Sequence, residues 1–239
     1  MDVFDIPNEP WPSAHCSSIV ELSEDRFMAT WYAGTSEAAR DVCVARSWFT
    51  RGSEWSDADV LVKTPDNPDG NGILFLDNSK MLWFFWNTIR GNQSNFLRHG
   101  WAATDNKYMT SMDGGQTWSD PVPLFPEQIG WNFKNKAIYL SNEFILLPMY
   151  DELAGTSVVA ISENNGLTWS ASQFIETDQD QPNKAQFVAP GYDIDDEPPL
   201  VPLFTNEQPT LIERSDGSVL AFLRTSNLDR IHRSLSQDH

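Results

Sequence analysis

The sequence has little of what marks several large protein classes. Its 239 residues include two cysteines, Cys16 and Cys43, which lack metal-ligand spacing and neither demand nor exclude a disulfide. No apolar run approaches the ~20 residues of a membrane-spanning helix, and helical periodicity is almost absent. The 16 Lys and Arg against 34 Asp and Glu give a net charge of −18, which disfavours nucleic acid and anionic membranes as partners. We predict no metal site, no cofactor and no membrane span.

Composition also bounds the size and location of the protein. Hydrophobic residues make up 40% of the chain, which is enough for a sizeable core, and the length fits one domain. The first five residues, Met1 to Asp5, lack the basic and apolar regions of a signal peptide, which favours a cytoplasmic location. An anionic ligand would need a local basic patch, for which Lys134, Lys136 and Arg224 are candidates.

An eight-residue pattern occurs twice in the chain. Residues Ser111 to Trp118 read SMDGGQTW and residues Ser162 to Trp169 read SENNGLTW, so both fit S-x-[DN]-x-G-x-T-W. Each copy follows a strand-like run and has the chemistry of a hairpin turn, because Asp or Asn bonds its own backbone and Gly supplies a positive φ. Fixed-period repeats indicate stacked supersecondary units. We interpret both copies as structural turns with the Trp packed beneath. A degraded copy ends at Trp55.

A second repeating element precedes each turn and consists of a polar residue, an apolar strand, a turn and another apolar strand. The strand pairs are 19–22 with 27–32, 73–76 with 81–86, 137–140 with 144–150, and 210–213 with 219–224. They predict an all-β fold, a β-propeller of which about four blades are present. Residues 176–205 are expected to form a long loop between blades. We expect one domain over residues 1–239, incomplete at its C-terminal end because a last copy of the turn begins at Ser236 and stops at His239.

Antiparallel connectivity sorts the residues to the two ends of the strands. If the repeated turns close one end, the start of each first strand, the end of each second strand and the following loop meet at the other. The residues at that other end are polar or aromatic: His15, Asn71, Asn135 and Gln208; Tyr32, Trp86, Tyr150 and Arg224; Glu37, Asp41, Asp151 and Glu152. We expect the functional site there, with its residues clustered on the face opposite Trp118 and Trp169.

The repeated turn resembles the Asp-box of the sialidase superfamily. Over nearly its whole length the chain resembles the branch with BNR repeats that is often labelled neuraminidase-like. The resemblance implies a six-bladed propeller in the full protein, with the Asp-boxes on the face away from the active site. It also implies a retaining glycosidase with a Tyr nucleophile, an assisting Glu, an Asp acid/base and an Arg triad that binds the substrate carboxylate, which is an exception to the two-carboxylate rule.

Matched position by position, the resemblance implies part of this machinery. Arg224 fits the second Arg of the triad, and its guanidinium fork suits a carboxylate. Asp41 fits the acid/base, with Glu37 as its neighbour and competitor. His15 stands where the first triad Arg is expected. Gln208 stands at the assisting Glu, with Glu207 one residue off and expected to face away. The nucleophilic Tyr and the third Arg would lie beyond His239.

These matches predict a sialidase-like exo-glycosidase that acts on a terminal, acidic sugar of a glycan. The expected catalytic residues are Glu37, Asp41 and His15, whose imidazole can act as acid or base near neutral pH. The expected substrate-binding residues are Arg224, Gln208, Asn135, Lys136, Tyr150 and Asp151. Two alternatives stay open: a non-catalytic glycan-binding propeller, and a polysaccharide lyase with His15 as the base. Purely structural roles stay open for His15, Tyr150 and Asp151.

Overall fold

The computed structural model describes residues 11–90, 100–152, 154–175, 186–187, 201–202, 206–225 and 231–236. These residues form antiparallel β-sheets and one short 3₁₀ helix, η1 (Gly100–Ala103), so the predicted all-β class is confirmed. The chain divides into two compact units, residues 1–92 with 103–129 and residues 93–102 with 130–239. In the described part of the chain, no helix has the length and apolar character needed to cross a membrane.

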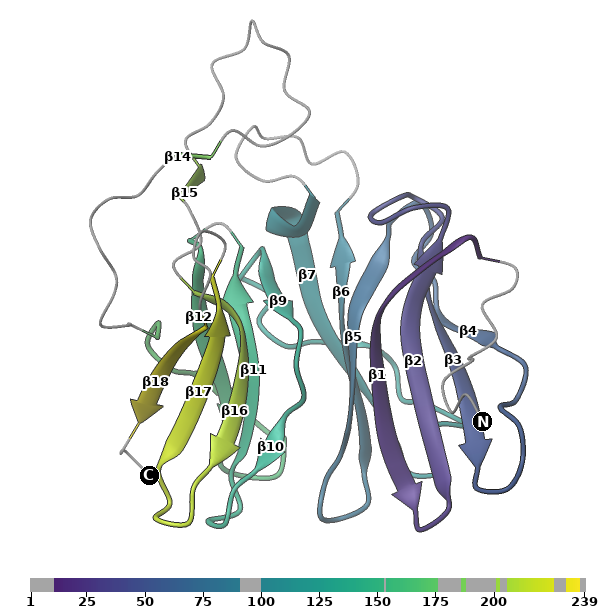
Figure 1. Ribbon diagram of the computed structural model, residues 1–239. Helices are drawn as coiled ribbons and strands as arrows, with labels where there is room; N and C mark the ends of the chain where they lie inside the picture. Colours follow the sequence, from purple (N-terminus) through teal and green to yellow (C-terminus); the bar gives the residue numbers. More distant parts are fainter. Residues whose placement is uncertain are drawn as a thin grey trace, which may run out of the picture. The chain divides into compact units, whose positions relative to one another are not determined.

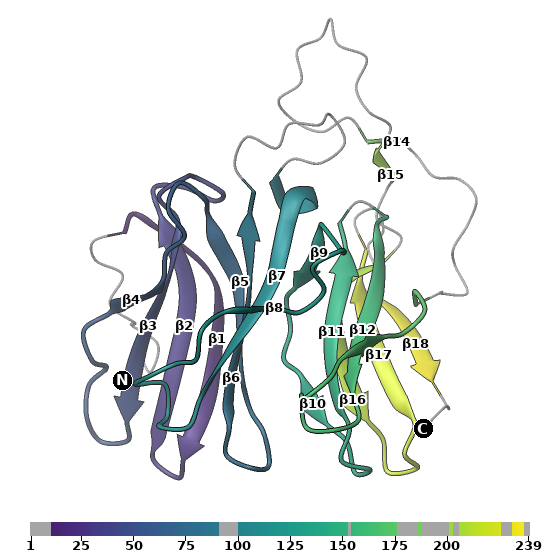
Figure 2. The ribbon, with the colours of Figure 1, turned by 180° about the vertical axis from the view of Figure 1, so that it is seen from behind.

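The first unit contains two four-stranded antiparallel sheets in which each strand pairs with the next along the chain (Figure 1). The first sheet consists of β1 (Ser13–Ser23), β2 (Arg26–Gly34), β3 (Cys43–Thr50) and β4 (Asp59–Val62). The second consists of β5 (Asp69–Leu76), β6 (Leu82–Ile89), β7 (Thr104–Ser111) and β8 (Val122–Pro123), which Figure 2 shows from behind. Each sheet is therefore the up-and-down unit of two hairpins that the sequence predicts.

The core of the first unit lies where β5 packs against β1, β2 and β3. Met28 and Val44 of the first sheet meet Leu74, Phe84 and Trp86 of the second. All five side chains are buried because period-2 alternation turns the apolar residues of neighbouring strands toward the same space. Burying a side chain of this size stabilises the fold by roughly 1.5–3 kcal/mol, so this cluster holds the two sheets together.

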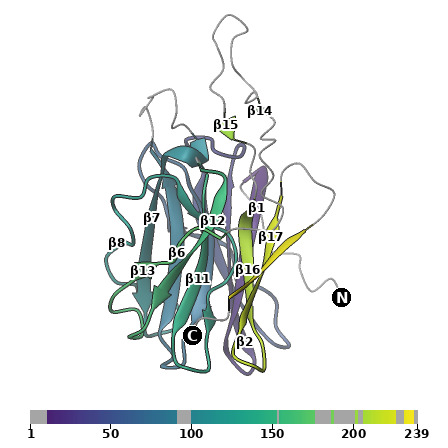
Figure 3. The ribbon, with the colours of Figure 1, turned by 90° about the vertical axis from the view of Figure 1, so that its left-hand side faces the viewer.

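The second unit repeats the arrangement with different strand lengths. One sheet has the order β10 (Ile138–Tyr139), β11 (Ile145–Asp151), β12 (Thr156–Ser162) and β13 (Ser170–Ala171), and β9 (Trp131–Phe133) also pairs with β11. Another has the order β16 (Glu207–Glu213), β17 (Val219–Arg224) and β18 (His232–Ser236), of which Figure 3 shows β16 beside β17. β14 (Gln186–Phe187) and β15 (Val201–Pro202) form a short pair.

β11 packs against β16 in the second unit. The shared core includes Leu146, Val159, Leu211 and Leu223. The predicted hairpins at 137–150 and 210–224 are thus present, and their assembly into a propeller stays a prediction. The predicted loop at 176–205 lies outside the described residues apart from β14 and β15, as do the last residues of the incomplete turn.

The first complete box is a turn held by its own side chains. Asp113 Oδ2 accepts a hydrogen bond from the Thr117 hydroxyl at 2.6 Å, and the Ser111 hydroxyl accepts one from the Gly115 N–H at 2.9 Å. Gly115 has a φ of 85°, a conformation that favours glycine. Trp118 Nε1 donates to the Gly115 carbonyl at 3.0 Å, so the indole lies beneath the turn as predicted.

The second box repeats this pattern with Asn164 in the acidic position. Asn164 Oδ1 accepts a hydrogen bond from the Thr168 N–H at 2.9 Å, and the Ser162 hydroxyl accepts one from the Gly166 N–H at 2.7 Å. Because all of these side-chain oxygens are occupied within the turn, both boxes are structural. The interpretation of the repeats as turns is confirmed.

Candidate functional site

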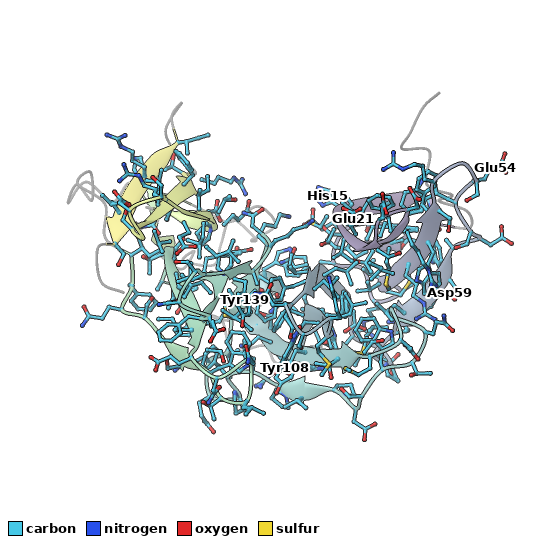
Figure 4. All side chains as sticks on the ribbon, turned by 90° about the horizontal axis from the view of Figure 1, so that it is seen from below. His15, Glu21, Glu54, Asp59, Tyr108 and Tyr139 are labelled. Carbon is cyan, nitrogen blue, oxygen red and sulfur yellow. The ribbon has the colours of Figure 1, made fainter. Side chains whose placement is uncertain are left out.

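His15 and Tyr32 form a pair at the end of the β1–β2 hairpin away from its turn. They face each other in the strand register, and His15 Nδ1 lies 2.5 Å from the Tyr32 hydroxyl. The two rings meet edge to face, with centroids 5.4 Å apart. Tyr32 is only 2% exposed, whereas 57% of the His15 side chain is exposed. Figure 4 labels His15 on its strand. A buried hydroxyl therefore holds an imidazole that solvent can reach.

Glu37, in the loop after β2, joins this pair. Its Oε2 lies 3.9 Å from His15 Nδ1, and its side chain is 53% exposed. Burial raises the pKa of Tyr32 well above its usual value, and the neighbouring Cys16 and Glu37 raise it further through their charges and hydrogen bonds. The Tyr32 hydroxyl consequently keeps its proton at neutral pH. We call His15, Tyr32 and Glu37 the histidine cluster.

Asp41 lies in the same loop but is engaged elsewhere. Its two carboxylate oxygens accept hydrogen bonds from the Thr35 N–H at 2.9 Å and the Thr35 hydroxyl at 2.8 Å. These bonds, led by that of the hydroxyl, lower the pKa of Asp41. Asp41 is held as a carboxylate that closes the loop, so its environment favours Glu37 over Asp41 as a proton donor.

In the second unit, Tyr150 and Asp151 end β11. Tyr150 is buried, and Asp151 Oδ2 accepts a hydrogen bond from Trp131 Nε1 at 3.0 Å while its Oδ1 accepts one from the Ala154 N–H at 2.9 Å. Asp151 thus shapes the turn that leads to β12. Ile145, at the other end of β11, pairs with Ser162 of the second box. About six residues at roughly 3.3 Å each separate the two ends.

Arg224 lies at the matching end of the neighbouring sheet, paired with Glu207 across β16 and β17. Its Nη1 lies 3.3 Å from Glu207 Oε1, and the Arg224 side chain is 59% exposed. Glu207 itself is 4% exposed. The expectation that Glu207 faces away is therefore wrong, because its carboxylate is buried against the guanidinium.

The orientation of Glu207 was predicted wrongly because β1, β5 and β16 each contain a β-bulge. Cys16, Asn71 and Gln208 each adopt a φ of 51°, and each interrupts the pairing of its strand with the next one. The extra residue shifts the alternation by one position. In the register, the counterpart of His15 is consequently Glu207, and Gln208 is the counterpart of Cys16.

Asn135 and Lys136 lie in the segment between β9 and β10. Asn135 Nδ2 donates hydrogen bonds to the carbonyls of Gln208 at 2.9 Å and Pro209 at 3.0 Å, so it ties this segment to the bulge of β16. Lys136 is an exposed residue, and partial desolvation of its ammonium group lowers its pKa. Asn135 therefore has a structural role. That Asn135 and Lys136 bind substrate stays a prediction.

The structure thus brings the predicted residues together in two groups, one in each unit. His15 and Glu37 meet in the first, and Arg224 lies with Glu207 in the second. In the sequence, Tyr32 and Glu152 stand at the ends of predicted strands or just after them. That position alone did not identify either one as a site residue. That all the predicted site residues lie together in one cluster stays a prediction. Among the described residues, no three His, Cys, Asp or Glu side chains are grouped to hold a metal ion.

The family assignment rests on the sequence as well as on the fold. The model of the BNR repeat-like domain family matches residues 25–239. The chain belongs to the BNR repeat-like domain family. This confirms the resemblance to the sialidase and BNR-repeat superfamily. Among curated proteins, none matches the chain significantly.

Solved structures with the same fold include sialidases and a protein of unknown function. The structure of the NanB sialidase from Streptococcus pneumoniae matches with a TM-score of 0.71 at 12% identity, over 98% of this chain and 52% of that one. The intramolecular trans-sialidase from Ruminococcus gnavus matches with a TM-score of 0.66 at 14% identity, over 94% of this chain and 68% of that one.

A protein of unknown function from Dyadobacter fermentans matches with a TM-score of 0.71 at 17% identity, over 98% of this chain and 68% of its own. The BNR repeat-like chain therefore spans about half the length of the NanB sialidase and two thirds of the other two. At these identities the likeness shows the fold.

Proposed function

We propose that this BNR repeat-like chain is part of a sialidase-type β-propeller enzyme that hydrolyses the glycosidic bond of a terminal acidic sugar. The observation that carries the proposal is the histidine cluster, in which the His15 imidazole lies within 4 Å of both the Tyr32 hydroxyl and the Glu37 carboxylate, at the end of the β1–β2 hairpin away from its turn. A catalytic acid or base must be oriented by a neighbouring group and must be within reach of the proton that it transfers. The Arg224 guanidinium supports an acidic sugar, since more than half of its side chain is exposed to bind a carboxylate.

In this proposal Glu37 is the general acid. Its proton goes to the glycosidic oxygen as the bond to the anomeric carbon breaks, and a water molecule supplies the hydroxyl that the anomeric carbon gains. Glu37, then a carboxylate, takes back the proton that this water loses. His15, which Tyr32 orients through the 2.5 Å contact, lies beside Glu37. Proton transfer by a positioned side chain contributes on the order of 10²–10⁴ in rate.

Elimination is the second candidate, and the contact between His15 and Tyr32 favours it specifically. A lyase needs a base for the proton on the carbon next to the sugar carboxylate and an acid for the leaving oxygen. An imidazole and a tyrosine that keeps its proton can fill these two roles at neutral pH. The product then contains a carbon–carbon double bond conjugated with the carboxylate and absorbs ultraviolet light, which a hydrolysis product does not.

The test is product analysis with oligosaccharides that end in sialic acid or in a uronic acid, and with oligosaccharides in which an internal uronic acid carries a sugar at C4, the bond that elimination breaks. We expect the release of a free acidic sugar without new ultraviolet absorbance, and we expect Glu37→Gln to lower the rate on the order of 10²-fold or more. The control is Glu24→Gln, which changes an exposed carboxylate in the β1–β2 turn at the other end of the same hairpin. Ultraviolet-absorbing products would establish elimination instead. Binding without any product would favour the glycan-binding alternative.

A further inference from the structure

The second box contains a chemically labile dipeptide. Asn165 is followed directly by Gly166, and the sequence contains the same dipeptide at one other place, at residues 71 and 72. Asparagine is one of the thermally labile side chains. A glycine that follows it has no Cβ, so its backbone nitrogen has the least hindered approach to the asparagine carboxamide. Asn165 is exposed, so water and base can reach it.

The backbone at Asn165 is also unusual for a residue with a side chain. Its φ is 54°, whereas the same position of the first box is occupied by Gly114, with a φ of 72°. The left-handed region disfavours residues with a Cβ, although asparagine adopts it more often than most. The conformation of Asn165 therefore depends on contacts that hold it in the turn.

Two hydrogen bonds restrain the two groups that would have to react with each other. The Tyr139 hydroxyl, from β10, donates to Asn165 Oδ1 at 2.7 Å and fixes the carboxamide. The Gly166 N–H donates to the Ser162 hydroxyl at 2.7 Å, and Gly166 is buried. A backbone nitrogen that is engaged in this way does not attack the neighbouring carboxamide. A reaction between them therefore requires local opening of the box, which is an ordinary fluctuation of exposed turns.

We propose that Asn165 is a deamidation site and that the hydrogen bond from Tyr139 sets the rate of its modification. In the open box, the Gly166 nitrogen gives up its proton and forms a bond to Asn165 Cγ. The bond from Cγ to Nδ2 breaks, and Nδ2 leaves with that proton as ammonia. Water then opens the resulting cyclic imide and leaves either aspartate or isoaspartate at position 165.

The isoaspartate product prevents the box from closing as before, because its backbone has an additional carbon atom within the turn. The bonds that Ser162 and Asn164 accept from the N–H groups of Gly166 and Thr168 both span this position. These bonds consequently cannot both reform in their original geometry. A rare opening of the box is thereby converted into a lasting change in the turn between β12 and β13.

The test is incubation of the folded chain at about pH 8, followed by peptide mapping with mass spectrometry. Fragment ions locate the mass increase that marks the change from a carboxamide to a carboxyl. We expect conversion at Asn165 but not at Asn71, which is 3% exposed. Gly72 packs so closely against Phe84 that an added Cβ would lie 2.8 Å from its ring. In urea both asparagines should convert, because the fold then restrains neither.

Two variants that remove the same atom test the role of Tyr139, and Figure 4 labels both tyrosines. Tyr139→Phe should raise the rate of conversion at Asn165 about fivefold, because the closed box loses one hydrogen bond of ordinary strength. Tyr108→Phe removes the hydroxyl of a tyrosine in β7 of the first unit, and its rate should match that of the unsubstituted chain.

The outcomes separate the parts of the proposal. Equal rates at Asn165 in Tyr139→Phe and in the unsubstituted chain overturn the role of Tyr139. Conversion of Asn71 as fast as Asn165 in the folded chain would show that the reaction follows global unfolding, which overturns local opening of the box. Absence of conversion at Asn165 in both folded chains overturns the site itself. None of these results bears on the proposed function.

Discussion

Gly115 offers a direct test of the packing beneath the first Asp-box. A Cβ added there would lie 2.6 Å from Met28 Sδ and 3.3 Å from Trp118 Cζ2. Met28 is fully buried in the core between the two sheets of the first unit, so it has little room to move. The backbone at Gly115 also has a φ of 85°, which a side chain disfavours. Gly115→Ala therefore combines backbone strain with overpacking.

Gly52, in the degraded box, separates the two contributions. Its φ is 84°, but an added Cβ there meets no atom within 4 Å. Gly52→Ala should cost about 1–2 kcal/mol from the backbone alone. Gly115→Ala should cost about 1–3 kcal/mol more, since the contact with Met28 adds the penalty of an overfilled core.

The assay is urea unfolding followed by tryptophan fluorescence, with the free energy of unfolding compared between the two variants and the unsubstituted chain. We expect a clearly lower midpoint for Gly115→Ala than for Gly52→Ala. Equal destabilisation of the two variants would refute the argument that Met28 packs tightly under this turn.

Three further predictions concern single residues. Tyr32→Phe should lower turnover on the order of 10²-fold and alter the pH–rate profile, whereas Tyr139→Phe, which removes a more accessible hydroxyl bonded to Asn165, should leave both unchanged in the same assay. Glu207→Gln should weaken the binding of an acidic glycoside about fivefold, because Arg224 loses the charged partner that orients it; calorimetry measures this, and unaltered affinity would contradict it. Asp113→Asn should lower stability at pH 7 but not in acid. The hydrogen bond from the Thr117 hydroxyl is the largest of the causes that lower the pKa of Asp113. The ionised Asp113 therefore stabilises the fold above pH about 4, and this stabilisation is lost as the pH falls. Urea unfolding at several pH values measures the difference in the free energy of unfolding between Asp113→Asn and the unsubstituted chain, and this difference should disappear in acid.

The strands and turns could be predicted because they are local. Alternating apolar residues define β2, β6, β11 and β17, and the boxes carry the Gly and Asx residues that their turns require. The sequence also places His15 and Arg224 at the ends of strands, since antiparallel connectivity follows from the order of the hairpins.

The finer geometry depends on features without a sequence signature. The bulges at Cys16, Asn71 and Gln208 are made by residues of different types, so counting along β16 put Gln208 where the register puts Glu207. The restraint on Asn165 comes from Tyr139 of β10, which lies 26 positions earlier in the chain. Only the folded arrangement shows that this hydrogen bond holds the labile side chain.

The most direct test of the central claim is product analysis after incubation of the chain with oligosaccharides that end in an acidic sugar. We expect the free acidic sugar to be released without new ultraviolet absorbance, and we expect Glu37→Gln to abolish most of this release while Glu24→Gln preserves it. An ultraviolet-absorbing product would contradict hydrolysis, and the absence of any product from a chain that binds the sugar would contradict catalysis.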